Sequence, residues 1–486
     1  MSEKTSRSSR LLLSVMGFSM VSLVLSSFFL FHSVINPLLP SSVFELIVVG
    51  DERVYFNPED GGYPIEPLVA PFSPSSIKDT YESKENTTEF RGNVDLMSGN
   101  NPACDKTKAR LRVYMYDLSP EFHFGLLDWK EGPNLIWPDV SNPSLVPRYP
   151  GGLNLQHSVE YWLTLDLLSS NTKEIVRPCT VIRVKTPSEA DVIFVPFFSS
   201  LSYNRHSKID GKEKVSLDRK LQNKLVEYLT RRPEWRKSRG KDHVIVAHHP
   251  NSMLYARKKL GSARLVLADF GRYASKTANV EKDVIAPYKH VVNTISSNSS
   301  APFEARPKLI FFQGAIFRKD GGAIRQELYY LLKDEKDVHF TFGSTQRSGV
   351  REASQGMGSS KFCLNVAGDT PSSNRLFDSI VSHCVPVIIS DDIELPYEDV
   401  VDYSEFSVFV WASDAVKEGF LLNLLRGISR DEWTMMWERL KQVAHHFEYR
   451  YPSQPGDAVD MIWQAIARKE SNVPSMKHTK RQYRMP

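Results

Sequence analysis

The chain has 486 residues, more than one hydrophobic core usually organises, so two domains with accessory segments are expected. Its composition, with 41% hydrophobic and 24% charged residues, is that of a globular protein and indicates no specialised class. The 61 basic and 57 acidic side chains leave a formal net charge of +4. This near balance argues against a dedicated nucleic-acid binder, and we expect no nucleic-acid partner.

The N-terminal region has the features of a membrane anchor. From Leu11 to Phe44 there is no Asp, Glu, Lys or Arg, and about 20 apolar residues suffice to cross a bilayer. Three basic residues precede this run, which predicts a cytosolic N-terminus under the positive-inside rule. A cleaved signal peptide is the alternative, but the run is longer than the usual apolar region of such peptides and no A-x-A site follows it. We therefore expect a single-pass type II membrane protein whose body is lumenal.

Irregular sequence follows the anchor. Eight prolines lie between Pro37 and Pro102 without a sustained hydrophobic period, which is typical of a stem that holds a folded body off the membrane. At the other end of the chain, basic residues from Lys477 to Arg484 follow the last helical pattern. Such a tail is usually solvated, and the alternative is that it holds acidic polysaccharide or lipid.

The chain has four cysteines and no C-x-x-C motif, so neither a zinc knuckle nor a thioredoxin-type site is indicated. In an oxidising lumen Cys104 and Cys179, which both lie beside turn-like sequence, are expected to form a disulfide. Cys363 and Cys384 lie in apolar runs, and we interpret them as buried thiols.

Between the stem and the tail, buried strand patterns alternate with amphipathic helix patterns. The first half predicts strands at 110–117, 191–198, 243–249 and 263–269 and helices at 155–170 and 216–232. The second half predicts strands at 308–314, 338–343, 361–368, 385–390 and 405–410 and helices at 322–335, 374–384, 431–447 and 458–467. Ser216 is the expected N-cap of the helix at 216–232. The alternation is the signature of parallel α/β layers, and a polar patch near residue 300 separates two of them.

The predicted organisation is therefore two Rossmann-like α/β domains facing a cleft, preceded by a single transmembrane helix and a stem. The expected segments are a cytosolic tail at 1–10, a transmembrane signal anchor at 11–35, a stem at 36–107, an N-terminal domain at 108–300, a C-terminal domain at 301–468 and a basic tail at 469–486.

One stretch of the second half, GDTPSSNRLFDSIVSHC from Gly368, places a polar turn between a strand and a helix. Free backbone N–H groups at such a helix start favour a phosphate, and the hydroxyls of Ser372 and Ser373 would assist. Arg375 can grip a diphosphate, while Asp378, one turn later, accepts hydrogen bonds from ribose or sugar hydroxyls. The alternative for this pair is an ordinary ion pair on a solvated helix face.

Three carboxylates follow the next apolar strand. Asp391, Asp392 and Glu394 could bind sugar hydroxyls, take a proton or hold a metal, and the alternative for the first two is that they cap a turn. We assign Glu394 as a candidate catalytic and donor-binding residue. No strict D-x-D metal motif occurs in the chain, so we predict that no metal or other cofactor is obligatory.

A second phosphate-binding candidate follows the strand at 308–314. This strand ends in Gly314, and Arg318 and Lys319 lie on the loop before the next helix, where they would neutralise a diphosphate leaving group. Exposed Arg-Lys pairs are common, so this pair by itself is weak evidence for a phosphate site. It is a stronger candidate because it lies in the same half of the chain as Arg375.

The first half offers polar residues at or near the ends of its expected strands. They are His157, His248, His249 and Asp269. Each histidine is more often a hydrogen-bonded structural residue than a base. Asp283 lies just before the junction of the two halves, where a general base would be useful, and by position alone we assign it as a candidate catalytic residue.

The stretch from Gly368 to Val410 resembles the C-terminal signature of the exostosin-like glycosyltransferases, and is similar to the plant cell-wall branch that includes arabinosyltransferases. Further motifs extend the resemblance over about residues 109–465, among them RLRVYMYD, ADVIFVPFF, LADFGR and KDVIAPY. The resemblance implies a GT-B fold, an inverting reaction and a nucleotide-sugar donor held by Arg375, Asp378 and Glu394. Asp378 stands where many relatives have Glu, which shortens its reach. The resemblance gives no support to a functional role for His248 and His249.

The resemblance makes 108–300 the acceptor-side domain and 301–468 the nucleotide-sugar-binding domain. We expect a Golgi enzyme that transfers a pentose, L-arabinose first, from a UDP-sugar to a polysaccharide such as pectic arabinan. Two N-glycosylation sequons, at Asn86 and Asn298, agree with a lumenal body. The alternatives are a xylosyl- or glucuronosyltransferase acting on xylan and a non-catalytic, glycan-binding or scaffolding subunit. Assembly with itself or with a related glycosyltransferase is a further expectation.

Overall fold

The computed structural model describes residues 109–130, 132, 135–172, 174–209, 213–317, 322–343 and 347–471, all of which belong to one compact unit. The predicted tail, anchor and stem lie outside the described residues, as do Asn86, Cys104, Arg318, Lys319 and most of the basic tail. Within the described ranges, no helix is both long and apolar enough to cross a bilayer.

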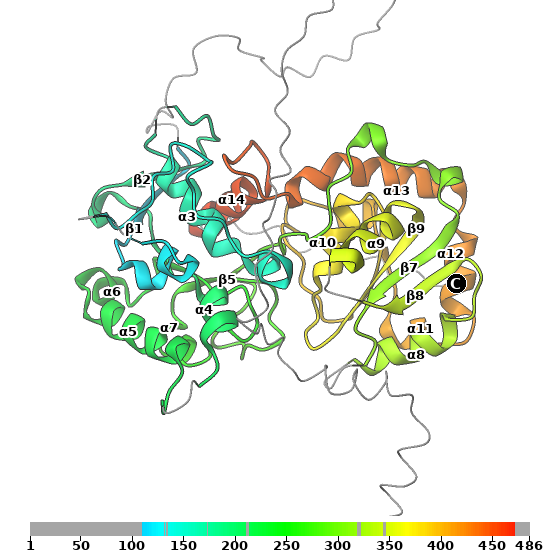
Figure 1. Ribbon diagram of the computed structural model, residues 1–486, viewed down its shortest axis with the longest axis horizontal. Coiled ribbons are helices and arrows are strands. Elements are labelled where there is room, and N and C mark those ends of the chain that lie inside the picture. The colour runs from blue at the N-terminus through cyan, green and yellow to red at the C-terminus, as the bar shows by residue number, and fades with distance from the viewer. Residues whose placement is uncertain are drawn as a thin grey trace, which may run out of the picture. The chain divides into compact units, whose positions relative to one another are not determined.

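The first half is built on a six-stranded parallel sheet (Figure 1). Its strands are β1 (Leu111–Met115), β2 (Val181–Val184), β3 (Val192–Val195), β4 (His243–Val246), β5 (Arg264–Leu267) and β6 (Val284–Ile285), in the order β2-β1-β3-β4-β5-β6. Strands β3, β4 and β5 are buried along their whole length, which is why they read as continuous apolar runs. The strands β2 and β6 were not predicted, because β2 is buried at only two of its four positions and β6 has two residues just before Pro287.

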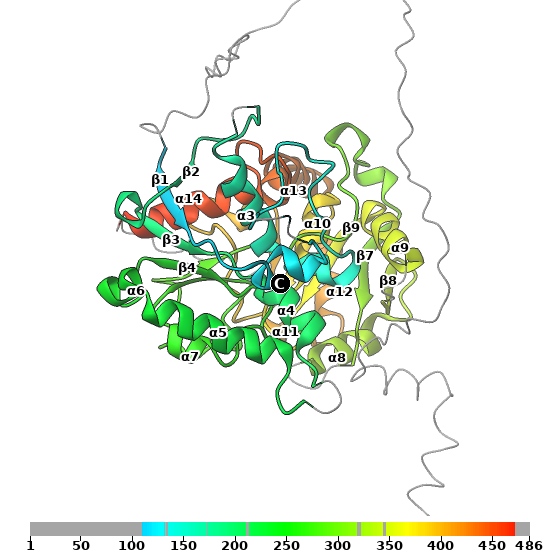
Figure 2. The ribbon, with the colours of Figure 1, turned by 60° about the vertical axis from the view of Figure 1, so that its left-hand side comes forward.

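Helices cover both faces of this sheet. They are α3 (Val159–Ser169), α4 (Ser199–His206), α5 (Leu217–Arg231), α6 (Pro233–Ser238) and α7 (Arg257–Leu260). Both views show α5, α6 and α7 on one face and α3 on the other (Figures 1 and 2). The predicted cap of α5 is confirmed, since Oγ of Ser216 accepts a hydrogen bond from the backbone N–H of Arg219 at 3.3 Å.

The second half is built on a five-stranded parallel sheet. Its strands are β7 (Lys308–Gly314), β8 (Val338–Phe342), β9 (Ser360–Val366), β10 (Val385–Ile389) and β11 (Val408–Phe409). Its helices are α8 (Ala323–Leu332), α9 (Arg347–Gly358), α10 (Asn374–Val381), α11 (Ala412–Ala415), α12 (Phe420–Gly427) and α13 (Arg430–Val443). Along β7, Ile310 and Phe312 belong to one hydrophobic cluster and Phe311 to another. The sheet is therefore packed on both faces, as a parallel sheet requires.

The described residues also contain short 3-10 helices. They are η1 (Pro120–Phe122), η2 (Phe124–Leu127), η3 (Gly152–His157), η4 (Pro187–Glu189), η5 (Ser297–Ser299), η6 (Phe303–Ala305), η7 (Tyr403–Glu405) and η8 (Ala444–Phe447).

The two sheets share one topology. The second has the order β11-β10-β9-β7-β8, so its first strand lies between the second and the third, as in the first sheet. In such sheets the connections leave in opposite directions from the first and third strands, and ligands bind beyond the carboxyl ends of these strands. In the second sheet this position lies after β7 and β9, where the polar turn and α10 begin.

The last helix, α14 (Ala458–Glu470), lies against the first sheet although the sequence analysis grouped it with the second half. Trp463 packs its ring 5.7 Å from that of Phe194 on β3. Oγ1 of Thr180 donates a hydrogen bond to Asp460 at 2.5 Å. Figures 1 and 2 both show α14 beside α3, so the last described helix packs with the first half.

The interpretation of Cys363 and Cys384 as buried thiols is wrong, because the two residues form a disulfide. Cys363 lies on β9 and pairs in register with Pro386 on β10, while Cys384 directly precedes β10. Parallel pairing of these neighbouring strands brings the two cysteines together. Cys179 is also disulfide-bonded, and its pairing with Cys104 stays a prediction.

Candidate functional site

A cavity of about 510 Å³ is lined by both halves of the molecule. The first half contributes η3 and residues that follow β4, β5 and β6. The second half contributes the end of β7, the polar turn after β9 and the start of α10. The cavity thus occupies the ligand position that the topology of the second sheet indicates.

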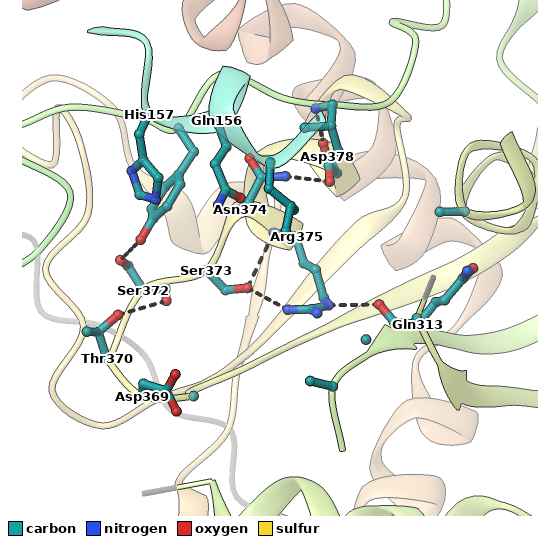
Figure 3. A pocket seen from close by; sticks show the side chains of 18 of the residues that line it. Gln156, His157, Gln313, Asp369, Thr370, Ser372, Ser373, Asn374, Arg375 and Asp378 are labelled. Atoms are coloured by element: carbon teal, nitrogen blue, oxygen red, sulfur yellow. Dashed lines mark hydrogen bonds between the residues drawn. The ribbon is translucent and has the colours of Figure 1, made fainter. Parts of the chain in front are cut away.

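Arg375, at the start of α10, is held firmly in the cavity wall. Its Nε donates to the carbonyl oxygen of Gln313 at 2.8 Å, and its Nη1 donates to Oγ of Ser373 at 3.0 Å (Figure 3). A Cβ added at Gly314 would lie 1.9 Å from Nη2 of the arginine. The glycine that ends β7 therefore makes room for the guanidinium. A fixed arginine beside a helix start suits a bidentate, charge-assisted contact with a phosphate.

Ser373 is the N-cap of α10, and its Oγ accepts from the backbone N–H of Arg375 at 3.4 Å. Ser372 has a different environment, since its Oγ donates to Oδ2 of Asp269 at 2.5 Å and lies 3.0 Å from the hydroxyl of Tyr288. Asp269 also accepts from the backbone N–H of Gly271 at 3.0 Å. Ser372 therefore joins the two halves across the cavity, although the sequence analysis expected it to contact a phosphate.

Asp378 lines the cavity but is 4% exposed, and both of its oxygens have partners. Oδ1 accepts from the backbone N–H of Val291 at 2.7 Å, and Oδ2 accepts from Nδ2 of Asn374 at 2.7 Å (Figure 3). Burial raises the pKa of this carboxyl to about 6, against the lowering effect of those backbone hydrogen bonds. Asp378 and Arg375 thus contact different groups, and Asp378 holds the segment between the two halves against α10.

The two carboxylates assigned as catalytic candidates lie outside the lining of this cavity. Asp283 is 2% exposed and accepts from the backbone N–H groups of Leu265 at 2.6 Å and Asn279 at 2.8 Å. It also pairs with Lys282. Glu394 is half-buried on the loop after β10. Neither carboxylate therefore belongs to the cavity lining that includes Arg375.

Asp391 and Asp392, at the start of that loop, are exposed. Oδ1 of Asp391 accepts from the backbone N–H of Ala412, the first residue of α11, at 2.9 Å. This contact fits the capping alternative for Asp391. Within the described ranges, no group of three or more His, Cys, Asp or Glu residues has an arrangement suited to a metal ion.

Three histidines of the first half gather behind and along the cavity wall. Nδ1 of His157 lies 2.9 Å from Nδ1 of His248, and the ring of His157 lies 4.6 Å from that of His249. His157 and His249 line the cavity. Burial is the main cause that lowers the pKa of all three, to about 3 for His248 and about 4 for His249. Each ring is therefore neutral near pH 7.

The cavity lining also contains polar residues that were not predicted as site residues, among them Arg272, Tyr288, Arg325 and Asp369. Arg325 is 2% exposed and donates to the carbonyl oxygens of Ala315, Val366 and Ala367. It thereby fixes the loops that follow β7 and β9. Its position near the start of an amphipathic helix pattern gave no signal for this role.

Comparison with known proteins shows the family. The model of the Exostosin GT47 domain matches residues 107–425. "Probable arabinosyltransferase ARAD1" of Arabidopsis thaliana is 41% identical over 366 residues, which cover 74% of this chain and 78% of that protein. "Probable glucuronoxylan glucuronosyltransferase IRX7" of the same organism is 27% identical over 308 residues, which cover 59% of this chain and 67% of that protein.

Among solved structures, WaaG, a glycosyltransferase involved in lipopolysaccharide biosynthesis, has 11% sequence identity and a TM-score of 0.32. The match covers 67% of this chain and 97% of that one, and at this score it supports no conclusion. The family model spans the first sheet and most of the second half, including the polar turn and Arg375. The chain belongs to the Exostosin GT47 family.

Proposed function

We propose that the protein is an inverting, GT-B type glycosyltransferase that moves a pentose, L-arabinose first, from a UDP-sugar to a cell-wall polysaccharide such as pectic arabinan. The strongest support is the position of Arg375, which is fixed by two hydrogen bonds in a cavity between two parallel α/β sheets. The similarity to a probable arabinosyltransferase over 74% of the chain supports the choice of sugar.

In this proposal the diphosphate of the donor lies against Arg375 and the first turn of α10. The cationic side chain and the backbone N–H groups of the helix start stabilise the negative charge that develops as the UDP departs. Arg318 and Lys319 are proposed to add charge from the loop after β7. The acceptor enters from the side of η3 and the loop after β4, which line the opposite wall of the same cavity.

The Golgi lumen is the proposed location of the folded body, with the segment at 11–35 as its membrane anchor. The Cys363–Cys384 disulfide supports an oxidising compartment, because structural disulfides are rare in the cytosol. Asn298 is exposed on η5, as a glycosylated asparagine must be. Digestion with a glycosidase specific for N-glycans should increase the mobility of the natural protein on a gel, and Asn298→Gln should remove part of that change.

The decisive experiment incubates the full chain with a panel of UDP-pentoses, UDP-hexoses and UDP-glucuronic acid, and with arabinan or xylan oligomers. We expect UDP release and arabinan extension with the arabinose donor, and loss of both in Arg375→Ala. Arg430→Ala is the matched control, because Arg430 is exposed and begins α13, away from the cavity. Full turnover by Arg375→Ala would overturn the assigned donor site.

The same panel separates the alternatives. Transfer of glucuronic acid or xylose to xylan would replace the arabinosyl proposal, and similarity to the probable glucuronoxylan glucuronosyltransferase makes this the second candidate. A chain that consumes no donor and gains no thermal stability from any UDP-sugar would instead be a scaffolding subunit. Activity should survive a chelator, and its loss on chelation would overturn the proposal that no metal is obligatory.

A further inference from the structure

A short hydrogen-bonded chain leads from the backbone of the first sheet to the cavity. His248 follows β4, and its Nε2 lies 3.1 Å from the carbonyl oxygen of Ala286, which follows β6. Its Nδ1 lies 2.9 Å from Nδ1 of His157, the last residue of η3. His157 lines the cavity, and His248 lies behind it with no exposed surface.

These contacts determine which nitrogen of each ring carries the proton. A carbonyl oxygen can only accept, so Nε2 of His248 must be the donor to Ala286. His248 is neutral because burial lowers its pKa to about 3, so its Nδ1 has no proton and accepts. Nδ1 of His157 must therefore be the donor. Burial also lowers the pKa of His157 well below its ordinary value, which leaves its Nε2 with a lone pair.

His249 has the opposite arrangement. Its Nδ1 accepts from the backbone N–H of Asn251 at 3.1 Å, so in the neutral ring the proton is on Nε2. Burial lowers the pKa of His249 to about 4, with Arg272 as a second cause. His249 can donate a hydrogen bond to a ligand in the cavity, but its Nε2 cannot take a proton from one.

The carboxylates near the cavity are less suited to accept a proton. Both oxygens of Asp378 and of Asp269 already accept hydrogen bonds from the protein. Asp369 lines the cavity from the polar turn of the second half, on the same side as Arg375. A base on the donor side would be close to the departing diphosphate, whereas His157 faces the cavity from the other half. Among these carboxylates, Asp369 is the one that competes with His157 for the role of general base.

We propose that Nε2 of His157 is the general base that takes the proton of the acceptor hydroxyl. The proposal rests on the proposed glycosyl transfer. The acceptor oxygen forms a bond to the anomeric carbon of the sugar, the bond from that carbon to the phosphate oxygen breaks with its electron pair leaving on UDP, and the hydroxyl proton moves to Nε2. His248 is a positioning residue, which holds the tautomer and the orientation of His157 through Nδ1.

The location of His157 explains how a ring with a low pKa can act as a base. Negative charge grows on the diphosphate as the sugar leaves, and Arg375 holds that group in the same cavity. A negative charge that develops in the same cavity raises the pKa of an imidazole on the opposite wall, although by less than direct contact would, so His157 becomes more basic as the sugar leaves the diphosphate. Removal of a general base typically lowers the rate by about 100- to 10,000-fold.

The test measures transfer by the full chain with a donor and acceptor that the wild-type protein uses. We expect His157→Ala to lower kcat by about 100-fold or more while the KM for the donor and the thermal shift produced by UDP stay unchanged. Added imidazole should restore part of the activity of His157→Ala, because it can occupy the vacated space and accept the proton. His445→Ala is the matched control, since His445 is exposed on η8 and lies outside the cavity lining.

Two further variants distinguish the roles. His248→Leu removes the acceptor for Nδ1 of His157 and should lower kcat, whereas His248→Gln can accept from His157 and donate to the carbonyl of Ala286 and should restore much of it. Activity of His157→Ala within about threefold of wild type, or a large loss in Asp369→Asn without a loss in His157→Ala, would overturn this inference. A wild-type protein that consumes no donor would instead count against the proposed function.

Discussion

The guanidinium of Arg375 occupies the space that a side chain at position 314 would fill. A Cβ at Gly314 would approach Nη2 to 1.9 Å and the central carbon of the guanidinium to 2.4 Å. The arginine comes from α10 and the glycine from the end of β7, 61 residues earlier. This contact explains why a glycine ends β7 in the cavity wall.

Gly314→Ala should weaken donor binding without removing a charge. The added methyl group displaces the guanidinium, and a lost charge-assisted hydrogen bond contributes about 1.5–3 kcal/mol, so we expect UDP to bind on the order of 10- to 100-fold more weakly. Calorimetry with UDP measures this change directly. Gly427→Ala is the control, because a Cβ there meets nothing within 4 Å. Equal UDP affinity in both variants would contradict the assigned role of Arg375.

Ser372→Ala should destabilise the contact between the two halves. The variant leaves the buried carboxylate of Asp269 and the hydroxyl of Tyr288 without this partner, and each unsatisfied group costs about 1–3 kcal/mol. A double-mutant cycle with Asp269→Asn, measured by urea unfolding, should give a coupling energy of about 0.5–3 kcal/mol. Strictly additive effects would show that the two side chains do not interact in solution.

Glu160→Gln should remove a pH-dependent loss of stability. Burial raises the pKa of Glu160 to about 7, from an ordinary value of 4.5, although its Oε1 accepts from Ser199 and Ser200. Between pH 4.5 and pH 7 the folded state therefore binds more protons than the unfolded state. The free energy of unfolding consequently falls as the pH rises through this range. The wild type should lose about 3 kcal/mol relative to Glu160→Gln between pH 4.5 and pH 7.

Urea unfolding of both proteins at several pH values checks this prediction. The difference between the two proteins isolates Glu160, because all other titrating groups are shared. Glu189→Gln is the control, since Glu189 is exposed on η4. A difference between wild type and Glu160→Gln that stays constant with pH would show that the carboxyl is charged or uncharged equally in both states.

Loss of the Cys363–Cys384 disulfide should lower stability. The bond closes a loop with a sequence separation of 21, and loops of this size contribute about 3 kcal/mol by restricting the unfolded chain. Each single Cys→Ala variant should therefore lose about as much stability as the double variant in urea unfolding. Unchanged stability in the double variant would indicate that the cysteines are reduced in the native protein.

Elements with a continuous apolar pattern were predicted well from the sequence. The strand expected at 308–314 is β7, with the same bounds, and the helix expected from residue 374 is α10, which begins there. Parallel strands buried on both faces leave an uninterrupted apolar run, and a capped amphipathic helix leaves a period of 3.6. Strand β2 is buried at only half of its positions, and β6 has two residues just before Pro287, so neither leaves such a pattern.

Only part of the candidate site could be predicted from the sequence. The placement of Arg375, Gly314 and Ser373 in one cavity wall agrees with the sequence analysis, because a polar turn between a strand and a helix is a local feature. Asp283 was chosen for its position in the chain alone, and its oxygens face backbone N–H groups of its own loop and of β5. No local pattern reports where a carboxylate points.

By itself the sequence determined the alternation of strands and helices and the presence of a polar turn before α10. These features depend on residues that are neighbours in the chain. The tertiary structure decided which residues meet across the cavity. Ser372 contacts Asp269 over 103 positions and His157 contacts His248 over 91. The first pair joins the two halves, and the second lies within the first half. Both pairs form only when the elements that carry them are packed, because their geometry depends on long-range burial that no single stretch of sequence contains.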